Sequence, residues 1–375
     1  MVPCLSDVSL LRSIPLTSLR TIAVVLVLAV LTTVVAAVLL PRTVPATAGA
    51  SSADEPTRLT RPALRTVLRG VGRYTARIVM VGVPVLLVVV LGGLLINRPM
   101  HYVRTVGDLA KAAAPRAQAN SRIESPPKSS AFGTAPASAW KASFHDVGDG
   151  SQEATWTGPV SGITLPVRVV LPAGYRPNDG RTYNVLVGLH GWVGDPQSLV
   201  TGIASPQRLQ EAIDAGRIPP SILVFPSLNA DGASQPDCVN INGRPPVGTW
   251  TAEEIPRMIQ ATFPNVTTQR AGWMIMGISA GAYCAARTAY DVPQRFGAVG
   301  VMSSYDLPGE GSLAHSGREL QAQNGLSTML GKRKPDGMRF YVLGAQDDPY
   351  GTARTAWSMD EVVRKPDSVT VDTPA

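Results

Sequence analysis

Histidine and cysteine are scarce in this sequence. The 375 residues include four histidines and three cysteines, and none has the spacing of a metal site. No glycine-rich phosphate loop follows an apolar strand, and no basic stretch is interleaved with aromatic residues, as nucleic-acid-binding surfaces often are. We therefore expect no metal site and no nucleic-acid partner.

Positive charge is concentrated in the first third of the chain. Before Trp140 there are 15 Lys and Arg against 5 Asp and Glu, whereas from Trp140 onward there are 19 against 22. The high isoelectric point, near 9.5, therefore belongs to the first third. Positive charge beside apolar spans is what the anionic headgroups of a membrane attract, so we expect a membrane partner.

Two apolar runs without any charge occupy residues 21–40 and 78–96. About twenty apolar residues in a helix match a hydrocarbon core of roughly 30 Å. Both runs therefore predict transmembrane helices, which would make residues 1–97 a membrane anchor. A buried core helix, or a cleaved signal peptide for the first run, is the alternative interpretation.

A basic segment over residues 58–77 separates the two apolar runs. Its arginines recur every three or four residues, so in a helix they share one face. We predict a basic amphipathic helix on an anionic leaflet, with a solvated basic loop as the alternative. The arginines are Arg58, Arg61, Arg65, Arg69, Arg73 and Arg77. Because arginine-rich loops stay in the cytoplasm, a multi-pass cell-membrane protein with its larger domain outside is expected.

The rest of the chain predicts a linker and one large domain. Residues 98–139 are rich in Ala, Pro and Ser, which is typical of a flexible linker. Over 140–375, short apolar runs alternate with helix-like segments, which indicates an α/β fold with a mostly parallel sheet and helices on both faces. The expected strands are 165–171, 183–189, 221–225, 272–278, 298–302, 339–343 and 368–371, and the expected helices are 206–215, 251–263, 280–290 and 352–364.

The most informative motif is Gly277-Ile278-Ser279-Ala280-Gly281, which fits the pattern G-x-S-x-G. It lies at the end of the apolar strand GWMIMGI and at the start of the helix-like stretch AGAYCAARTAY. In a nucleophile elbow the serine sits on a tight strand-to-helix turn that requires small flanking residues. The motif therefore predicts Ser279 as a nucleophile and the Ala280 N–H as a donor to an oxyanion.

The stretch Leu189-His190-Gly191-Trp192 follows an earlier apolar strand. A turn at this place supplies the second oxyanion donor of such an elbow, here the backbone N–H of Trp192. We expect the backbone to act there, and the His190 ring to be a structural side chain packed under the turn.

Two consecutive acids follow the late strand RFYVL in the stretch GAQDD. An acid on such a loop can orient a catalytic histidine and stabilise its charged form. We choose Asp347 for this role, with Asp348 in reserve. The other aspartate would cap the helix that begins near Thr352.

These motifs resemble the putative-esterase family that includes esterase D, S-formylglutathione hydrolases, feruloyl esterases and actinobacterial mycolyltransferases. The resemblance rests on VLVGLHGW, on MGISAGAYCAARTAYDVPQRFGAVGVMSSYD and on VLGAQDDPYG, and it spans nearly all of residues 155–371. The stretch DCVNINGRPPVGTWTAEEIPRMI is also similar to the one before the elbow in secreted actinobacterial members. The resemblance implies an α/β-hydrolase fold and ester hydrolysis or acyl transfer through an acyl-enzyme, chemistry that needs no cofactor.

One feature departs from the family pattern. The family places its histidine in a loop resembling Gly-His-x-Trp after the last strand, whereas here the strand SVTV runs into residues 372–375. The histidines of this chain are His101, His145, His190 and His315, and none follows the acid. We therefore expect an esterase domain over 140–375 that is incomplete at its C-terminus and lacks the catalytic histidine. A pseudoenzyme, or His315 as a substitute base, is the alternative.

Two of the three cysteines fall in the expected outer domain. Cys238 precedes the elbow and Cys284 lies on the helix that follows it. An oxidising exterior would permit a disulfide between them, and two free thiols are the alternative.

Three hypotheses for function follow from these residues. The first is a serine carboxylic-ester hydrolase that acts on a small-molecule or lipid ester at the outer membrane face, through an acyl-enzyme on Ser279. The second is an acyltransferase of the mycolyl type, which passes a long acyl group to a sugar. The third is a membrane-tethered binding protein without turnover, which the missing histidine favours.

Overall fold

The computed structural model describes residues 14–43, 61–100, 105–106, 122–124, 133, 135–230, 235–309 and 311–375. The chain divides into two compact units, Met1–Ala110 and Lys111–Ala375. Most of the predicted linker over 98–139 lies outside the described residues, so its flexibility stays a prediction.

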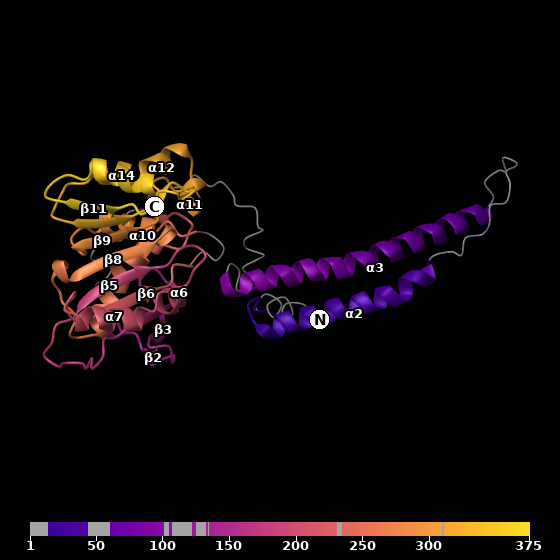
Figure 1. Ribbon diagram of the computed structural model, residues 1–375, viewed down its shortest axis with the longest axis horizontal. Helices are drawn as coiled ribbons and strands as arrows, with labels where there is room; N and C mark the ends of the chain where they lie inside the picture. Colours follow the sequence, from indigo (N-terminus) through magenta and orange to yellow (C-terminus); the bar gives the residue numbers. More distant parts are fainter. Residues whose placement is uncertain are drawn as a thin grey trace. The chain divides into compact units, whose positions relative to one another are not determined.

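In the part of the first unit that the structure describes, the long elements are the helices α2 (Leu19–Thr43) and α3 (Arg61–Met100) (Figure 1). Within them, Leu19–Leu40 and Arg77–Arg98 are each 22 residues long, with mean hydropathies of 3.0 and 2.9. Only 11 % and 6 % of these stretches is buried, unlike a core helix of a soluble domain. By length and composition, both helices are therefore able to cross a membrane, where the sequence predicted spans at 21–40 and 78–96.

The basic segment predicted over 58–77 is helical from Arg61 and continues without a break into the second apolar stretch. Residues 58–60 and most of the side chains of this segment lie outside the described part of the chain. The basic face of this helix therefore stays a prediction.

The second unit is built on a nine-stranded sheet in the order β11-β10-β9-β8-β5-β6-β4-β3-β2. Strands β5, β6, β8, β9, β10 and β11 run parallel, and β2, β3 and β4 join antiparallel at one edge. The strand bounds are β2 His145–Asp146, β3 Gln152–Thr157, β4 Thr164–Val170, β5 Asn184–Leu189, β6 Ser221–Pro226, β8 Trp273–Ile278, β9 Ala298–Met302, β10 Arg339–Leu343 and β11 Ser368–Asp372. A separate antiparallel pair joins β1 (Ile123–Glu124) to β7 (Asn240–Ile241).

Helices lie on both faces of this sheet, as the sequence predicted (Figure 1). The larger core includes Val187, Ile275 and Val299 of the strands and is covered by α10 and α14. On the other face, Leu209 and Phe225 belong to a smaller core beneath α6 and α7. The helix bounds are α6 Pro196–Thr201, α7 Ser205–Asp214, α8 Val247–Thr249, α9 Ile255–Thr262, α10 Ala280–Asp291, α11 Gly311–Ala314, α12 Arg318–Gln323, α13 Leu326–Lys332 and α14 Thr352–Val362.

The helix expected over 251–263 is not one regular α-helix. It begins as a π-helical turn, Trp250–Glu254, and continues as α9. Pro256 lies in the first turn of α9 and has no N–H, so it cannot donate the bond to the Ala252 carbonyl that would join the two parts.

Candidate active site

Ser279 occupies a sharp turn between β8 and α10. Its backbone has φ 54° and ψ −121°, a conformation that L residues rarely adopt. The Ser279 N–H donates a 2.9 Å hydrogen bond to the Met302 carbonyl of the neighbouring strand. A β-carbon on Gly277 would lie 2.1 Å from the Gly281 carbonyl oxygen, and one on Gly281 would lie 2.2 Å from that of Leu189. Both positions thus require glycine, as expected for a nucleophile elbow.

The two predicted oxyanion donors flank this turn. Ala280 is the first residue of α10, and the N–H groups in the first turn of a helix have no intrahelical acceptor. A β-carbon added to Gly191 would lie 3.5 Å from the Ser279 Cβ, so the turn after β5 contacts the elbow. Trp192 follows Gly191 and lines the same cavity as Ser279. The fold thus brings both donor-bearing segments to the serine.

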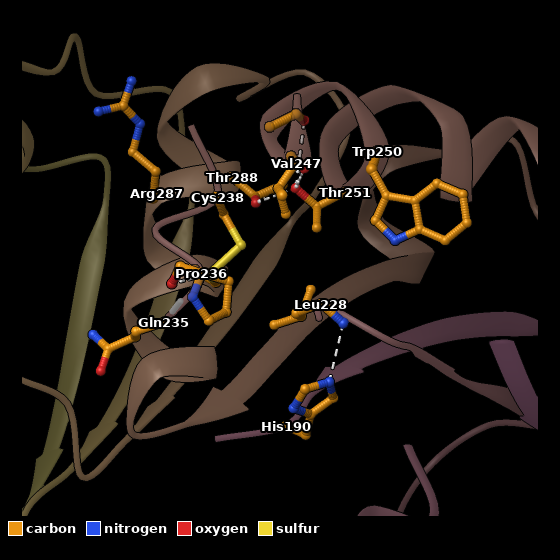
Figure 2. Close-up of a disulfide and its surroundings, with 12 residues drawn as sticks. His190, Leu228, Gln235, Pro236, Cys238, Val247, Trp250, Thr251, Arg287 and Thr288 are labelled. Atoms are coloured by element: carbon orange, nitrogen blue, oxygen red, sulfur yellow. Dashed lines mark hydrogen bonds between the residues drawn. A yellow bond between two sulfur atoms is a disulfide. The ribbon is translucent and has the colours of Figure 1, made fainter. Parts of the chain in front are cut away.

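His190 supports the turn from below and does not face the cavity. Its side chain is fully buried, and its Nε2 accepts a 3.0 Å hydrogen bond from the Leu228 N–H (Figure 2). Because Nε2 is the acceptor, the ring proton lies on Nδ1, which donates to the Gly191 carbonyl at 2.9 Å. The structural role predicted for this histidine is confirmed.

Ser279 opens on a cavity of about 470 Å³. The cavity lies beyond the carboxyl ends of β5, β8, β9 and β10, where open α/β sheets bind their ligands. Its lining is largely aromatic, aliphatic and uncharged, with one carboxylate. The lining residues are Trp192, Gln235, Ile278, Ser279, Ser303, Tyr305, Leu307, Gly309, Asp348, Tyr350 and Thr352.

Of the two candidate acids, Asp348 lines this cavity and Asp347 does not. Asp348 Oδ1 accepts a 2.9 Å bond from the Tyr350 N–H, and its Oδ2 accepts a 2.7 Å bond from the Thr352 hydroxyl. Asp348 therefore holds the start of α14 in place. Asp347 is exposed on the same loop, and its choice as the orienting acid stays a prediction.

No histidine that the structure describes lines the cavity. His145 is exposed in β2, at the far edge of the sheet. His315 is exposed beyond α11, and its Nδ1 lies 2.5 Å from the Gly311 carbonyl oxygen. His101 is outside the described residues.

Several cavity residues carry no motif and were not predicted. Ser303 and Tyr305 follow β9, and Tyr350 follows β10. Their place after the carboxyl ends of parallel strands is the signal that would have found them. Gln235, whose amide donates a 2.6 Å bond to the Tyr305 hydroxyl, offers no such signal, because it comes from an irregular loop.

The predicted disulfide between Cys238 and Cys284 is confirmed, with a Cα–Cα distance of 5.1 Å. It joins the loop that carries Gln235 to α10, the helix of the elbow (Figure 2). Among the described residues, no group of His, Cys, Asp and Glu could hold a metal ion.

The parallel sheet, the elbow and the cavity define an enzyme of the α/β-hydrolase fold. The family described as "putative esterase" matches residues 161–371, more than half of the chain. The chain therefore belongs to this esterase family, and the class of reaction is carboxylic-ester hydrolysis.

The solved structures to which the chain is similar include several esterases. A ferulic acid esterase is 17 % identical, with a TM-score of 0.49 and 63 % of this chain and 93 % of that one covered. An S-formylglutathione hydrolase from Agrobacterium tumefaciens is 14 % identical, with a TM-score of 0.48 and 62 % of this chain and 89 % of that one covered. The enterobactin esterase FES from Shigella flexneri is 16 % identical, with a TM-score of 0.45 and 60 % of this chain and 54 % of that one covered. No protein of the curated set matches the chain.

Proposed function

We propose that the protein is a serine esterase in which the Ser279 hydroxyl attacks the carbonyl carbon of an ester. The attack forms an acyl-enzyme and releases the alcohol, and water then releases the acid. The observation that carries the proposal is Ser279 itself, at a positive φ on the elbow and at the wall of a 470 Å³ cavity. The N–H groups of Ala280 and Trp192 stabilise the negative charge that develops on the carbonyl oxygen.

The hydroxyl must lose its proton as it attacks, and the acid of the site must orient the base that takes the proton. For the acid we propose Asp347, since Asp348 already accepts two hydrogen bonds within its own loop. His315 is the candidate for a substitute base. It lies between β9 and β10, outside the lining of the cavity, and its Nδ1 is bound to the Gly311 carbonyl. To act as the base it must move toward Ser279 and accept the proton on Nε2.

The proposal is tested by hydrolysis of p-nitrophenyl acetate and by labelling with a fluorophosphonate, read as intact mass. Ser279→Ala is expected to abolish both, whereas Ser358→Ala, a serine of α14 outside the cavity, should leave both unchanged. Hydrolysis or labelling that survives in Ser279→Ala contradicts the proposal. A wild type that neither hydrolyses the ester nor is labelled would instead favour a binding protein that lacks the base, because an unactivated serine hydroxyl is a weak nucleophile.

Variants of the remaining side chains assign the other roles. Asp347→Asn and Asp348→Asn are compared for kcat at matched stability, and the larger loss of kcat identifies the orienting acid. If His315 is the base, His315→Ala loses activity as completely as Ser279→Ala does. An unchanged rate in His315→Ala removes it from the mechanism.

We further propose that this reaction takes place on the outer side of a membrane. The two apolar stretches support a multi-pass anchor, and the arginines between them favour a cytoplasmic position for that segment. The Cys238–Cys284 disulfide supports the same orientation, because disulfides persist in oxidising compartments.

A further inference from the structure

A second cavity lies on the sheet face opposite α10, and we call it the apolar groove. Its volume is about 190 Å³. Met276 of β8 and Met302 of β9 form its floor, and Leu199, Ile203 and Leu209 form the wall on the side of α6 and α7. Two polar side chains line the groove. The Ser205 hydroxyl donates a hydrogen bond to the Leu199 carbonyl, and Arg208 is the one charged residue of the lining.

The apolar groove adjoins the cavity of Ser279. Ile278, the residue before the nucleophile, lines both spaces. Its side chain is 43 % exposed, and its Cγ2 would lie 3.8 Å from a β-carbon on Gly191, so it forms the border beneath the oxyanion turn. Ile278 is thus the one side chain that separates the two spaces, and a chain attached at Ser279 Oγ would have to cross it to enter the groove.

The chemistry of the groove fits an unbranched hydrocarbon. Ile203 is 49 % exposed, so apolar surface faces water when the groove holds nothing else. The two methionines on the floor are unbranched and flexible, and such side chains adapt to chains of different length. At about 190 Å³ the groove is several times larger than the roughly 30 Å³ of a water molecule, which is room for a chain of several carbons.

We propose that the apolar groove binds the unbranched acyl chain of the ester that Ser279 attacks. This inference rests on the proposed esterase function and adds the class of substrate: an ester of a medium- or long-chain aliphatic acid, as opposed to an ester of acetic acid or of an aromatic acid. From the carbonyl carbon at Ser279, the acyl chain extends across Ile278 and lies between α7 and the methionine floor. The alcohol part of the ester then occupies the cavity of Ser279, beside Trp192 and Tyr305.

The first test measures kcat/KM for p-nitrophenyl esters from acetate to octanoate, with the full-length chain in lipid nanodiscs. Each methylene that enters the groove should raise kcat/KM about fourfold, until the groove is full. Ile203→Glu should lower the ratio of octanoate to acetate activity by roughly tenfold or more. The control Trp357→Glu, on an exposed position of α14, should keep the wild-type ratio. A ratio that is the same in all three proteins overturns the proposal.

The second test does not require turnover. Ser279→Ala is irradiated with an octanoate ester that carries a diazirine at the end of its chain, and the cross-linked peptide is identified by mass spectrometry. Adducts on residues 196–213 or 274–278 support the groove, even if the wild type fails to hydrolyse any ester and the proposed function falls. Adducts beside Leu307 or Tyr350 overturn it. The proposal is also overturned if no adduct forms and the protein is a dimer in solution, because the apolar groove would then be covered by a second copy of the chain.

Discussion

At the scale of single residues, the glycines of the elbow decide whether Ser279 can act. Ser279 holds its backbone at φ 54°, and two glycines leave room for the carbonyl groups that surround the turn. The sequence motif identified these positions correctly because the requirement is local: a strand, one strained residue and a helix in immediate succession.

Gly281→Ala tests this steric requirement. The added methyl group would lie 2.2 Å from the Leu189 carbonyl oxygen and 2.5 Å from that of His190, so the backbone must move. We expect a loss in the free energy of unfolding of about 1–3 kcal/mol and a loss of labelling at Ser279. The control is Gly331→Ala in α13, where the nearest atom would be 3.6 Å away and alanine favours the helix. Equal stability of both variants in urea denaturation would contradict the steric argument.

Asp237, the neighbour of the disulfide, makes stability depend on pH. Burial raises the pKa of its carboxyl from 3.8 to about 7, although the Leu313 N–H donates to it at 2.7 Å. The folded state therefore binds this proton more tightly than the unfolded chain does. The stability that Asp237 contributes is complete below pH 3.8 and is lost as the pH rises through about 7.

Asp237→Asn cannot ionise and should remove this loss. Because one pKa unit corresponds to about 1.4 kcal/mol, the variant is expected to gain roughly 4 kcal/mol relative to the wild type between acidic pH and pH above 7. The measurement is the free energy of unfolding in urea across that range. Parallel pH profiles for the two proteins would show that the Asp237 carboxyl does not titrate there.

At the scale of elements, two contacts distant in sequence hold the second unit together. The Cys238–Cys284 disulfide closes a loop of 46 residues between the Gln235 segment and α10. The double variant Cys238→Ala/Cys284→Ala should lose about 2–4 kcal/mol of stability. Thermal unfolding with and without reductant is the check. Reductant should lower the Tm of the wild type and leave that of the double variant unchanged. A wild type whose Tm stays the same when the disulfide has been reduced would contradict the prediction.

Asp367 joins the starts of β10 and β11. Its Oδ1 accepts hydrogen bonds of 2.8–2.9 Å from the N–H groups of Asp336, Gly337 and Met338, and its Oδ2 pairs with the buried Arg333. Asp367→Asn removes the more buried of the two carboxylates that pair with this arginine, the other being Asp336, so we expect a loss of roughly 3 kcal/mol. The exposed Asp360→Asn in α14 serves as control and should change stability little. The two variants are compared by chemical denaturation, and equal midpoints would refute the role of Asp367.

The expected strands show where element prediction succeeds. The seven strands inferred from apolar runs are present, each within about a residue of its expected start. The antiparallel strand β3, which lies next to the edge strand β2, was missed. Its sequence QEATWT is mostly polar, and only Ala154 and Trp156 are buried, so the pattern was too short to reveal a strand before the sheet was known.

At the scale of the whole molecule, the chain combines two units with different surfaces. The exposed apolar side chains of α2 and α3 are unfavourable in water and favourable in lipid. We expect the full-length chain to stay in the membrane pellet after extraction with alkaline carbonate. Residues 135–375 expressed alone should appear in the supernatant. Release of the full-length chain by carbonate would show that neither helix spans the bilayer.

The sequence by itself determined the features that depend on neighbouring residues: the two apolar spans, the strand and helix pattern, and Ser279 on its elbow. These follow from periodicity, composition and local sterics. The tertiary structure decided the cavity walls, the buried acceptor role of His190, the position of Asp348 in place of Asp347 at the cavity, and the apolar groove shared through Ile278. Each of these depends on loops and faces that are far apart in the chain, and only packing brings them together.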